Sequence, residues 1–211
     1  MKFAVSSSEL LKGLLTVSKA IPSKATEAIL EDYLFSLSGD LLEVTASDKE
    51  ITMKTSIAVD NKEGDGRIAV PARQLNDLLR ELPDQPLTIR TISENQFECA
   101  WASGESSLPY FNPDDYPECQ TTGPDAITVE FPAMTLVDGI SRTIYASSDE
   151  DNRPVMNSIF FDINPDSTTL VASDLQKLTC YTADDVKAEN PCSFILNKRH
   201  AAVIKSIIGK D

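Results

Sequence analysis

Histidine, the side chain that most often acts as a general acid or base, occurs once in this sequence, and no catalytic pattern surrounds it. The only histidine among the 211 residues, His200, follows Lys198-Arg199 and has no patterned nucleophile beside it. A hydrolytic site needs a nucleophile, a base and an orienting group within reach of one another. No glycine-rich phosphate loop is present either. We therefore predict a surface histidine, no cofactor and a protein that is not an enzyme, with a hydrolase of unrecognised site as an alternative.

Metal-binding patterns are equally weak. The acidic run at residues 147–152 lacks the glycine and the distal glutamate of a twelve-residue calcium loop, so we expect a solvated loop there. The cysteines show no C-x-x-C spacing and no clustered histidines, which predicts reduced structural thiols and no metal site. They are Cys99, Cys119, Cys180 and Cys192.

Composition sets broad limits on partners and location. Hydrophobic residues make up 41% and charged residues 25%, which is ordinary for a globular protein. The start, MKFAVSSSELLK, has no apolar core of a signal peptide, and no apolar run approaches the roughly 18 residues of a membrane span. A cytoplasmic protein without a membrane partner is expected. The net charge of −14, taken alone, argues against nucleic acid as a partner.

The chain contains an internal repeat with an offset of 126 residues. Thr45-Ala46-Ser47-Asp48 falls on Val171-Ala172-Ser173-Asp174, and Gly13 falls on Gly139. The apolar pattern agrees without a gap between 29–37 and 155–163, and between 68–82 and 194–208. Fixed register over several elements indicates two copies of one structural unit. Each strand-ending aspartate is predicted to accept hydrogen bonds from turn N–H groups.

Each copy is predicted to hold two helices and an antiparallel sheet, which is the α+β class. Leu10, Leu14, Val17 and Ile21 recur at helical spacing after a serine cap, and Pro71 precedes a second helix at 72–82. The predicted strands are 2–5, 33–37, 42–46, 51–59, 67–70, 86–92, 96–102 and 105–110 in the first copy, with 127–131 opening the second.

A polar, proline-rich run at 112–125 is the predicted linker. It separates a first domain at 1–120 from a second at 126–211. The second copy ends at Asp211, which corresponds to Gln85, so its last strands have no counterpart and we expect a truncated second domain.

The predicted helices are basic although the protein is acidic. At about 100° per residue, their lysines and arginines lie opposite the apolar stripes. An ordinary solvated face explains this for one helix, whereas repetition over four helices favours a surface that holds a polyanion through its phosphates. These helices carry nine basic and four acidic residues. The basic ones are Lys12, Lys19, Arg73, Arg80, Arg142, Lys198, Arg199, Lys205 and Lys210.

These segments together resemble the bacterial sliding clamp family, the β subunit of the replicative DNA polymerase. The resemblance runs through the whole chain in order. It rests on MKFAVSSSELLKGLL, AILEDYLFSL, LEVTASDKE, RIAVPARQLNDLLRELP and PDDYPE in the first copy, and on RPVMNSIFFDI, TLVASDLQKL and FILNKRHAAVIKSI in the second.

The resemblance implies a DNA-clamp fold with three such domains per protomer. Two protomers would close head-to-tail into a homodimer ring around double-stranded DNA, without reading its sequence, and tether polymerase as a processivity factor. The third domain is absent from this chain, so no ring is expected from the chain itself. Polymerase, clamp loader and repair proteins are the implied partners, through short peptide motifs. A non-catalytic scaffold whose basic helices contact an acidic protein is the remaining alternative.

The resemblance also implies two sites. Lys24, Arg73, Lys198 and Arg199 occupy positions that present basic side chains to DNA. The second site is half of a partner-peptide cleft, whose other wall belongs to the third domain, so strong peptide binding is not expected. Where the family often has Gly-His-Arg, this chain has Leu175-Gln176-Lys177. The matching cleft positions are Met156, Ser173, Leu175, Gln176, Lys177 and Leu178.

Overall fold

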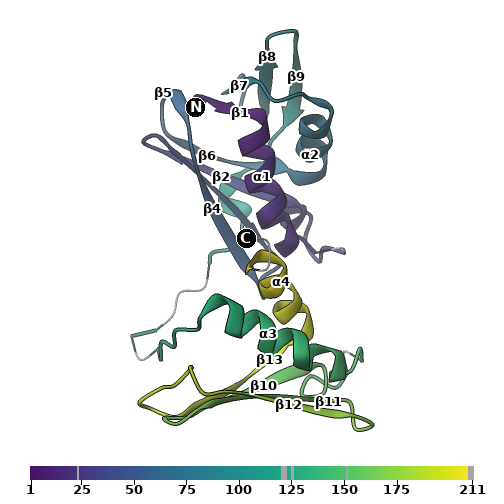
Figure 1. Cartoon of the computed structure of the whole chain (residues 1–211). Coiled ribbons are helices and arrows are strands. Elements are labelled where there is room, and N and C mark those ends of the chain that lie inside the picture. Colours follow the sequence, from purple (N-terminus) through teal and green to yellow (C-terminus); the bar gives the residue numbers. More distant parts are fainter. Residues whose placement is uncertain (23, 120–122, 125, 151, 209–211) are drawn as a thin grey trace. The chain divides into compact units, whose positions relative to one another are not determined.

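A computed structural model describes residues 1–22, 24–119, 123–124, 126–150 and 152–208. The chain divides into two compact units, Met1–Gln120 and Thr121–Asp211 (Figure 1). Every strand pairing among the described residues is antiparallel, and each unit carries two α-helices. The predicted α+β class is confirmed. Lys210 and Asp211 lie outside the described residues, as does part of the expected linker.

Unit 1 contains two sheets and the helices α1 (Ser7–Val17) and α2 (Ala72–Glu81). The five-stranded sheet has the order β5-β1-β7-β8-β9, and the four-stranded sheet has the order β4-β3-β2-β6. Large side chains from both sheets, including Phe3, Tyr33 and Phe97, are fully buried with the apolar stripe of α1. The strands are β1 (Lys2–Ser6), β2 (Asp32–Ser38), β3 (Leu41–Ser47), β4 (Thr52–Ala58), β5 (Asp60–Glu63), β6 (Gly66–Pro71), β7 (Pro86–Thr91), β8 (Gln96–Trp101) and β9 (Gly104–Pro109).

Helix α1 starts and packs as its sequence predicts. The Ser6 side chain accepts a hydrogen bond from the Glu9 N–H at 3.4 Å, which is an N-cap. Gly13 lies where the helix crosses β4, and a Cβ there would stand 2.7 Å from Ile57 Cδ1. At its repeat counterpart Gly139, an added Cβ would stand 2.9 Å from Leu170 Cδ2. The repeated glycine therefore allows a helix to approach its sheet closely.

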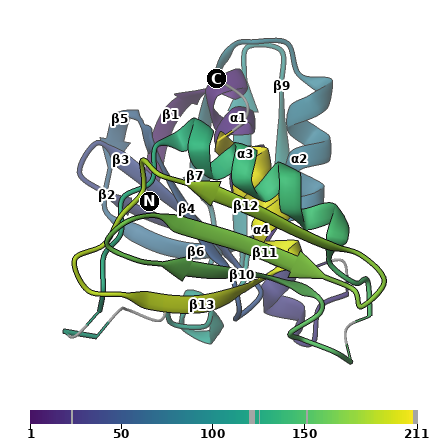
Figure 2. The ribbon, with the colours of Figure 1, turned by 60° about the horizontal axis from the view of Figure 1, so that its bottom comes forward.

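Unit 2 is a single four-stranded sheet, of order β12-β11-β10-β13, with both helices on one face (Figure 2). Its core contains Ile140 of α3, Ala201 of α4, and Ile159, Phe161 and Leu170 from the sheet. The elements are α3 (Ala133–Thr143), β10 (Ser158–Ile163), β11 (Thr168–Ser173), β12 (Leu178–Ala183), β13 (Cys192–Asn197) and α4 (Lys198–Ile208).

The strand predicted at 127–131 does not form, and that prediction is wrong. In unit 1 the equivalent strand β1 pairs with β7 and β5. In unit 2, residues 127–131 pair with no strand among the described residues. A strand needs a neighbour for its backbone hydrogen bonds, so 127–131 is irregular and Ile127 is exposed. The sequence did not predict strand β5, because its residues are polar and show no apolar alternation.

Two smaller expectations have different outcomes. All four thiols are free, and burial raises the pKa of the Cys99 thiol to about 12, so Cys99 is an inert core residue. His200, expected at the surface, lies in the first turn of α4 with intermediate exposure. In the described part of the chain no helix is long and apolar enough to span a membrane. The same residues hold no cluster of three or more potential metal ligands, and Asp151 of the acidic run lies outside them.

Residues 111–119, which we call the strap, cross the face of the β4-β3-β2-β6 sheet that α1 and α2 leave open. Phe111 forms a β-bridge with Ala69 of β6, with N···O distances of 3.1 and 2.8 Å. The buried Tyr116 donates from its hydroxyl to the Asp32 carbonyl of β2 at 3.3 Å. The strap then reaches the ends of β3 and β4, where Pro117 and Glu118 line a pocket with Ser47 and Thr52, so part of this second face is covered. The first part of the expected linker is thus a packed element of unit 1.

The strap lies beside a carboxyl group whose protonation affects stability. Asp32 is 5% exposed, and burial, followed by the nearby Glu31, raises its pKa from 3.8 to about 6. The folded state therefore disfavours the charged form. Stability should be lost as the pH rises from about 4 through 6, and the loss should be complete above 6.

We predict that Asp32→Asn stabilises unit 1 at pH 8, by up to about 2 kcal/mol, and has little effect at pH 4. Urea unfolding followed by fluorescence of Trp101, the only tryptophan in the sequence, measures this because that residue lies in unit 1. Asp60→Asn, at an exposed position, is the control. An equal effect of Asp32→Asn at both pH values would contradict the prediction.

Candidate functional site

The repeated Ala-Ser-Asp stretch forms the same turn in both copies. Asp174 Oδ1 accepts the N–H groups of Gln176 and Lys177 at 3.1 and 2.9 Å. Asp48 Oδ1 accepts the equivalent pair, from residues 50 and 51, at 2.9 and 2.6 Å. The preceding serine accepts one further N–H in each copy. The prediction that these aspartates bind turn N–H groups is confirmed. At Asp174 these backbone bonds, followed by the Lys177 ammonium, lower the carboxyl pKa to about 2.

This turn forces the next residue into the left-handed backbone region. Leu175 has a φ of 75°, and its counterpart Lys49 has a φ of 76°. Side chains with a Cβ are strained in this region, where glycine is not. The turn also pushes Leu175 away from the sheet, and its side chain is 69% exposed.

The structure gathers most of the predicted cleft residues on the turn between β11 and β12. Leu178 is also 69% exposed, Gln176 and Lys177 are exposed, and Ser173 is half-buried, with its hydroxyl donating to the Lys177 carbonyl at 2.9 Å. Met156 comes from a different segment, two residues before β10. The register pairs Phe160 with Val171, so it directs the Met156 end of β10 toward the same turn.

Two exposed apolar side chains in this region were not singled out from the sequence. The Tyr145 hydroxyl bonds the Thr179 hydroxyl at 2.8 Å, which holds its ring, 60% exposed, beside the start of β12. Val155, next to Met156, is 67% exposed. No local pattern marks Tyr145, because its place depends on how the end of α3 packs against β12. The repeat aligned Val155 with Ile29 but gave it no role in a site.

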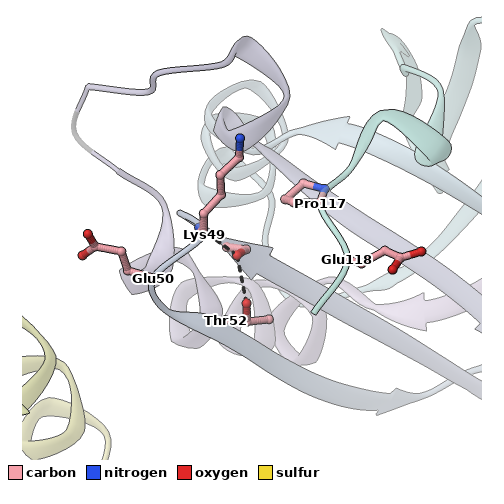
Figure 3. A pocket seen from close by; sticks show the side chains of 6 residues that line it. Lys49, Glu50, Thr52, Pro117 and Glu118 are labelled. Atoms are coloured by element: carbon pink, nitrogen blue, oxygen red, sulfur yellow. Dashed lines mark hydrogen bonds between the residues drawn. The ribbon is translucent and has the colours of Figure 1, made fainter. Parts of the chain in front are cut away.

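Unit 1 shows the equivalent turn with a second wall. A pocket of about 390 Å³ lies between the turn and the strap, and its lining side chains are drawn in Figure 3. The Ser47 and Thr52 hydroxyls bond each other at 2.9 Å, and Lys49 pairs with Glu27 outside the pocket. Where unit 2 presents Leu175 and Leu178, this pocket is therefore polar. Its lining residues are Ser47, Lys49, Glu50, Thr52, Pro117 and Glu118.

The predicted DNA-contacting residues divide between the units. Lys24 and Arg73 belong to unit 1, where Lys24 is exposed and Arg73, in the first turn of α2, has a side chain that is 95% exposed. Asp77 lies 3.9 Å from Arg73 and 3.4 Å from Arg80, so one carboxylate serves both guanidinium groups. Arg199 of unit 2 is exposed on α4.

Lys198 differs from the other three residues. Its ammonium group donates to Asp149 Oδ1 at 2.6 Å and to the Ser147 carbonyl at 3.2 Å, and its side chain is only 26% exposed. The ammonium in turn lowers the pKa of Asp149. Lys198 therefore joins the start of α4 to the loop at 147–149. Its charge is partly neutralised before any ligand arrives.

Positive charge on the helices is concentrated in α4. Helices α1, α2 and α3 each contain as many acidic as basic residues within their observed bounds. Helix α4 contains Lys198, Arg199 and Lys205 and no acidic residue. The expectation of four basic helices is thus wrong as stated, because acidic residues balance the arginines of α2 and α3, and Lys19 lies beyond the end of α1.

The left-handed turn yields a testable prediction. Leu175→Gly should stabilise unit 2 by about 0.5–1 kcal/mol, because relief of the left-handed strain exceeds the entropy cost of glycine. Gln176→Gly, one residue later in the same turn, is the matched control and should destabilise. Hydrogen exchange of the β11 and β12 amides measures both. If the two variants shift protection in the same direction, strain at Leu175 is not the cause.

Comparison with known proteins agrees with this architecture. Residues 1–120 match the family model for the DNA polymerase III beta subunit, N-terminal domain. A beta sliding clamp of Synechococcus elongatus is 24% identical over 196 residues, covering 92% of this chain and 52% of the relative. A beta sliding clamp of Halalkalibacterium halodurans is 28% identical over 189 residues, covering 84% of this chain and 48% of that relative.

The fold is also found among solved structures. The crystal structure of the DNA polymerase III subunit beta from Pseudomonas aeruginosa superimposes with a TM-score of 0.90 at 23% identity, covering all of this chain and 57% of that one. The chain spans about half the length of the curated relatives it matches. Because the family model covers more than half of the sequence, the chain belongs to the DNA polymerase III beta subunit family.

Proposed function

We propose that this chain is part of a sliding clamp, a ring that encircles duplex DNA and acts as a processivity factor in replication. The proposal rests on one observation: a protein named beta sliding clamp aligns with 92% of this chain, through both repeat copies. In this proposal residues 1–120 are the first clamp domain and 126–211 the beginning of the second. The role is mechanical rather than catalytic, and the place of action is the cytoplasm.

The proposed DNA contacts differ in exposure and in the elements that carry them. Arg199 and Lys205 are exposed on a helix without acidic residues, and Arg73 is almost fully exposed with a carboxylate at 3.9 Å. Lys24 is exposed in the segment after α1. Contacts of this kind hold phosphates and are independent of base sequence. Lys198 would act mainly by placing the 147–149 loop, because Asp149 already engages it.

The proposed partners are polymerase, clamp loader and repair proteins, which would dock short peptide motifs at the β11–β12 turn. The exposed Leu175 and Leu178 support an apolar contact, and Tyr145 and Val155 enlarge it. Apolar anchors in a small exposed patch are the usual basis of peptide docking. The wall that the strap forms in unit 1 has no counterpart among the described residues of unit 2, so we propose weak binding by this chain alone.

The exposure of these basic residues predicts the behaviour of two variants. Arg199→Glu with Lys205→Glu should weaken association with a short duplex about tenfold at low salt and reduce the salt slope by about 2. Lys198→Gln should change the slope little and lower the stability of unit 2. Lys54→Glu with Lys187→Glu, at two lysines outside the helices, is the charge-matched control. Equal weakening by this control would mean that only net charge matters.

Whether the protein encircles DNA is tested by its retention on circular DNA. The native protein carrying this sequence is loaded onto nicked circular DNA, and its retention is measured before and after linearisation. A sliding clamp stays on the circle and is lost from the cut ends. The scaffold alternative predicts equal loss from both forms, and that result would overturn the clamp proposal. For the hydrolase alternative, a turnover assay would have to find activity that His200→Ala removes.

A further inference from the structure

The strap of unit 1 lies over a buried carboxyl group that has no positive partner. Tyr33 and Phe35 of β2 belong to the main core, so strand alternation places Asp32 on the opposite face, together with Leu34. Asp32 is only 5% exposed. Burial and the neighbouring Glu31 both disfavour its charge, and no hydrogen bond or cation among the described residues offsets them. An ionised Asp32 is therefore a buried and unpaired charge, which is unfavourable.

The charged groups on the neighbouring elements do not compensate for Asp32. The cations of β4, of β6 and of the turn after β3 already pair with other carboxylates. These pairs are Lys54 with Glu43, Arg67 with Asp114, and Lys49 with Glu27. The remaining titratable groups near Asp32 and the strap are acids, namely Glu31, the Tyr33 and Tyr116 hydroxyls and the Cys119 thiol. None of these acids can supply a positive charge.

The Tyr116 hydroxyl fastens the strap beside this carboxyl group. It donates to the Asp32 carbonyl at 3.3 Å, and the backbone of Ser47 hydrogen-bonds the same hydroxyl. The pairing of β2 with β3 ends at Leu34 and Thr45, so the hydroxyl bridges two strand ends that are not paired directly. Burial raises the pKa of Tyr116, which therefore keeps its proton while Asp32 titrates. The strap and the Asp32 carboxyl group thus meet at one point of the sheet.

The repeat shows which chemistry this buried position requires. The counterpart of Asp32 in unit 2 is Ser158, which is 3% exposed and donates its hydroxyl to the Pro154 carbonyl at 2.6 Å. A neutral carboxyl group also carries an O–H that can donate, whereas a carboxylate only accepts. The position therefore suits the neutral form of Asp32, in agreement with its pKa of about 6.

We propose that the strap is a pH-dependent latch on unit 1, closed over neutral Asp32 and released from the sheet when Asp32 ionises. Release brings water to the carboxylate, which removes the penalty for burying an unpaired charge. Phe111 and Tyr116 are two points at which the strap bonds the sheet, through the β-bridge to Ala69 and the hydroxyl bond to Asp32. Once released, residues 111–119 join the connection between the two units. The latch does not depend on DNA binding.

The direction of the pH dependence follows from proton binding. Below about pH 4 the closed and the open strap both hold the proton of Asp32, so closure is unaffected by pH. Between about pH 4 and 6 only the closed form holds it, and rising pH favours opening. Above about pH 6 neither form holds it, and the effect is complete. The opening equilibrium constant should therefore rise by up to about 100-fold between about pH 4 and 7.

Hydrogen exchange of the 211-residue chain tests the latch. Phe111 and Ala69 each donate their N–H to the other's carbonyl, at 2.8 and 3.1 Å, so both amides report on closure. After correction for intrinsic exchange rates, their protection should fall by up to about 100-fold between about pH 4 and 7. At about pH 7 it should be lower than that of the β1 and β7 amides and insensitive to dilute urea, because the strap opens without unfolding of the core. Equal protection and equal urea dependence of the two groups of amides would overturn the proposal.

Three substitutions separate the latch from a general loss of stability. Asp32→Asn should keep the strap amides protected at about pH 7 and abolish the pH dependence, because an amide side chain stays neutral. Tyr116→Phe should lower their protection at every pH and leave the pH dependence in place, since Asp32 still titrates. Asp60→Asn, at an exposed position of β5, is the charge-matched control and should behave as the parent chain does. A pH dependence that survives Asp32→Asn, or that Asp60→Asn removes, contradicts the latch.

Discussion

Each repeat copy presents a four-stranded antiparallel sheet with two faces, and covering both faces is the constraint on which the rest of the structure depends. In unit 1 the helices cover one face and the strap covers part of the other, so Leu34 and Ala69 are buried outside the main core cluster. In unit 2 the helices α3 and α4 cover one face, and on the other face Phe160 and Ile195 are 40% and 47% exposed. A sheet of this kind is stable only where its apolar side chains leave water.

The two copies keep the same backbone and differ in what the backbone displays. Asp48 and Asp174 each close the same turn with two N–H bonds, and the next residue enters the left-handed region in both copies. After that point unit 1 has a lysine and unit 2 a leucine. A polar pocket results in one copy and an exposed apolar patch in the other, although the turn itself is unchanged.

The helices of the two units share basic positions but differ in net charge. The repeat places basic residues on the outward side of every helix, yet nearby carboxylates offset those of α2 and α3. Only α4 carries an excess of positive charge within its bounds. Exposed pairs of this kind contribute little to stability. They still matter for a polyanion, because each carboxylate competes with a phosphate for the same cation.

The sequence by itself determined the local elements: the serine cap of α1, the aspartate turns, the apolar stripes and the repeat that relates the two units. These depend on residues close together in the chain or on a fixed offset. Tertiary structure alone decided that Asp149 engages Lys198, and that Phe160 is exposed where Leu34 is buried. Each of these outcomes depends on groups that meet across long stretches of chain. No local pattern encodes such meetings, because they are set by strand register and by which segment covers which face.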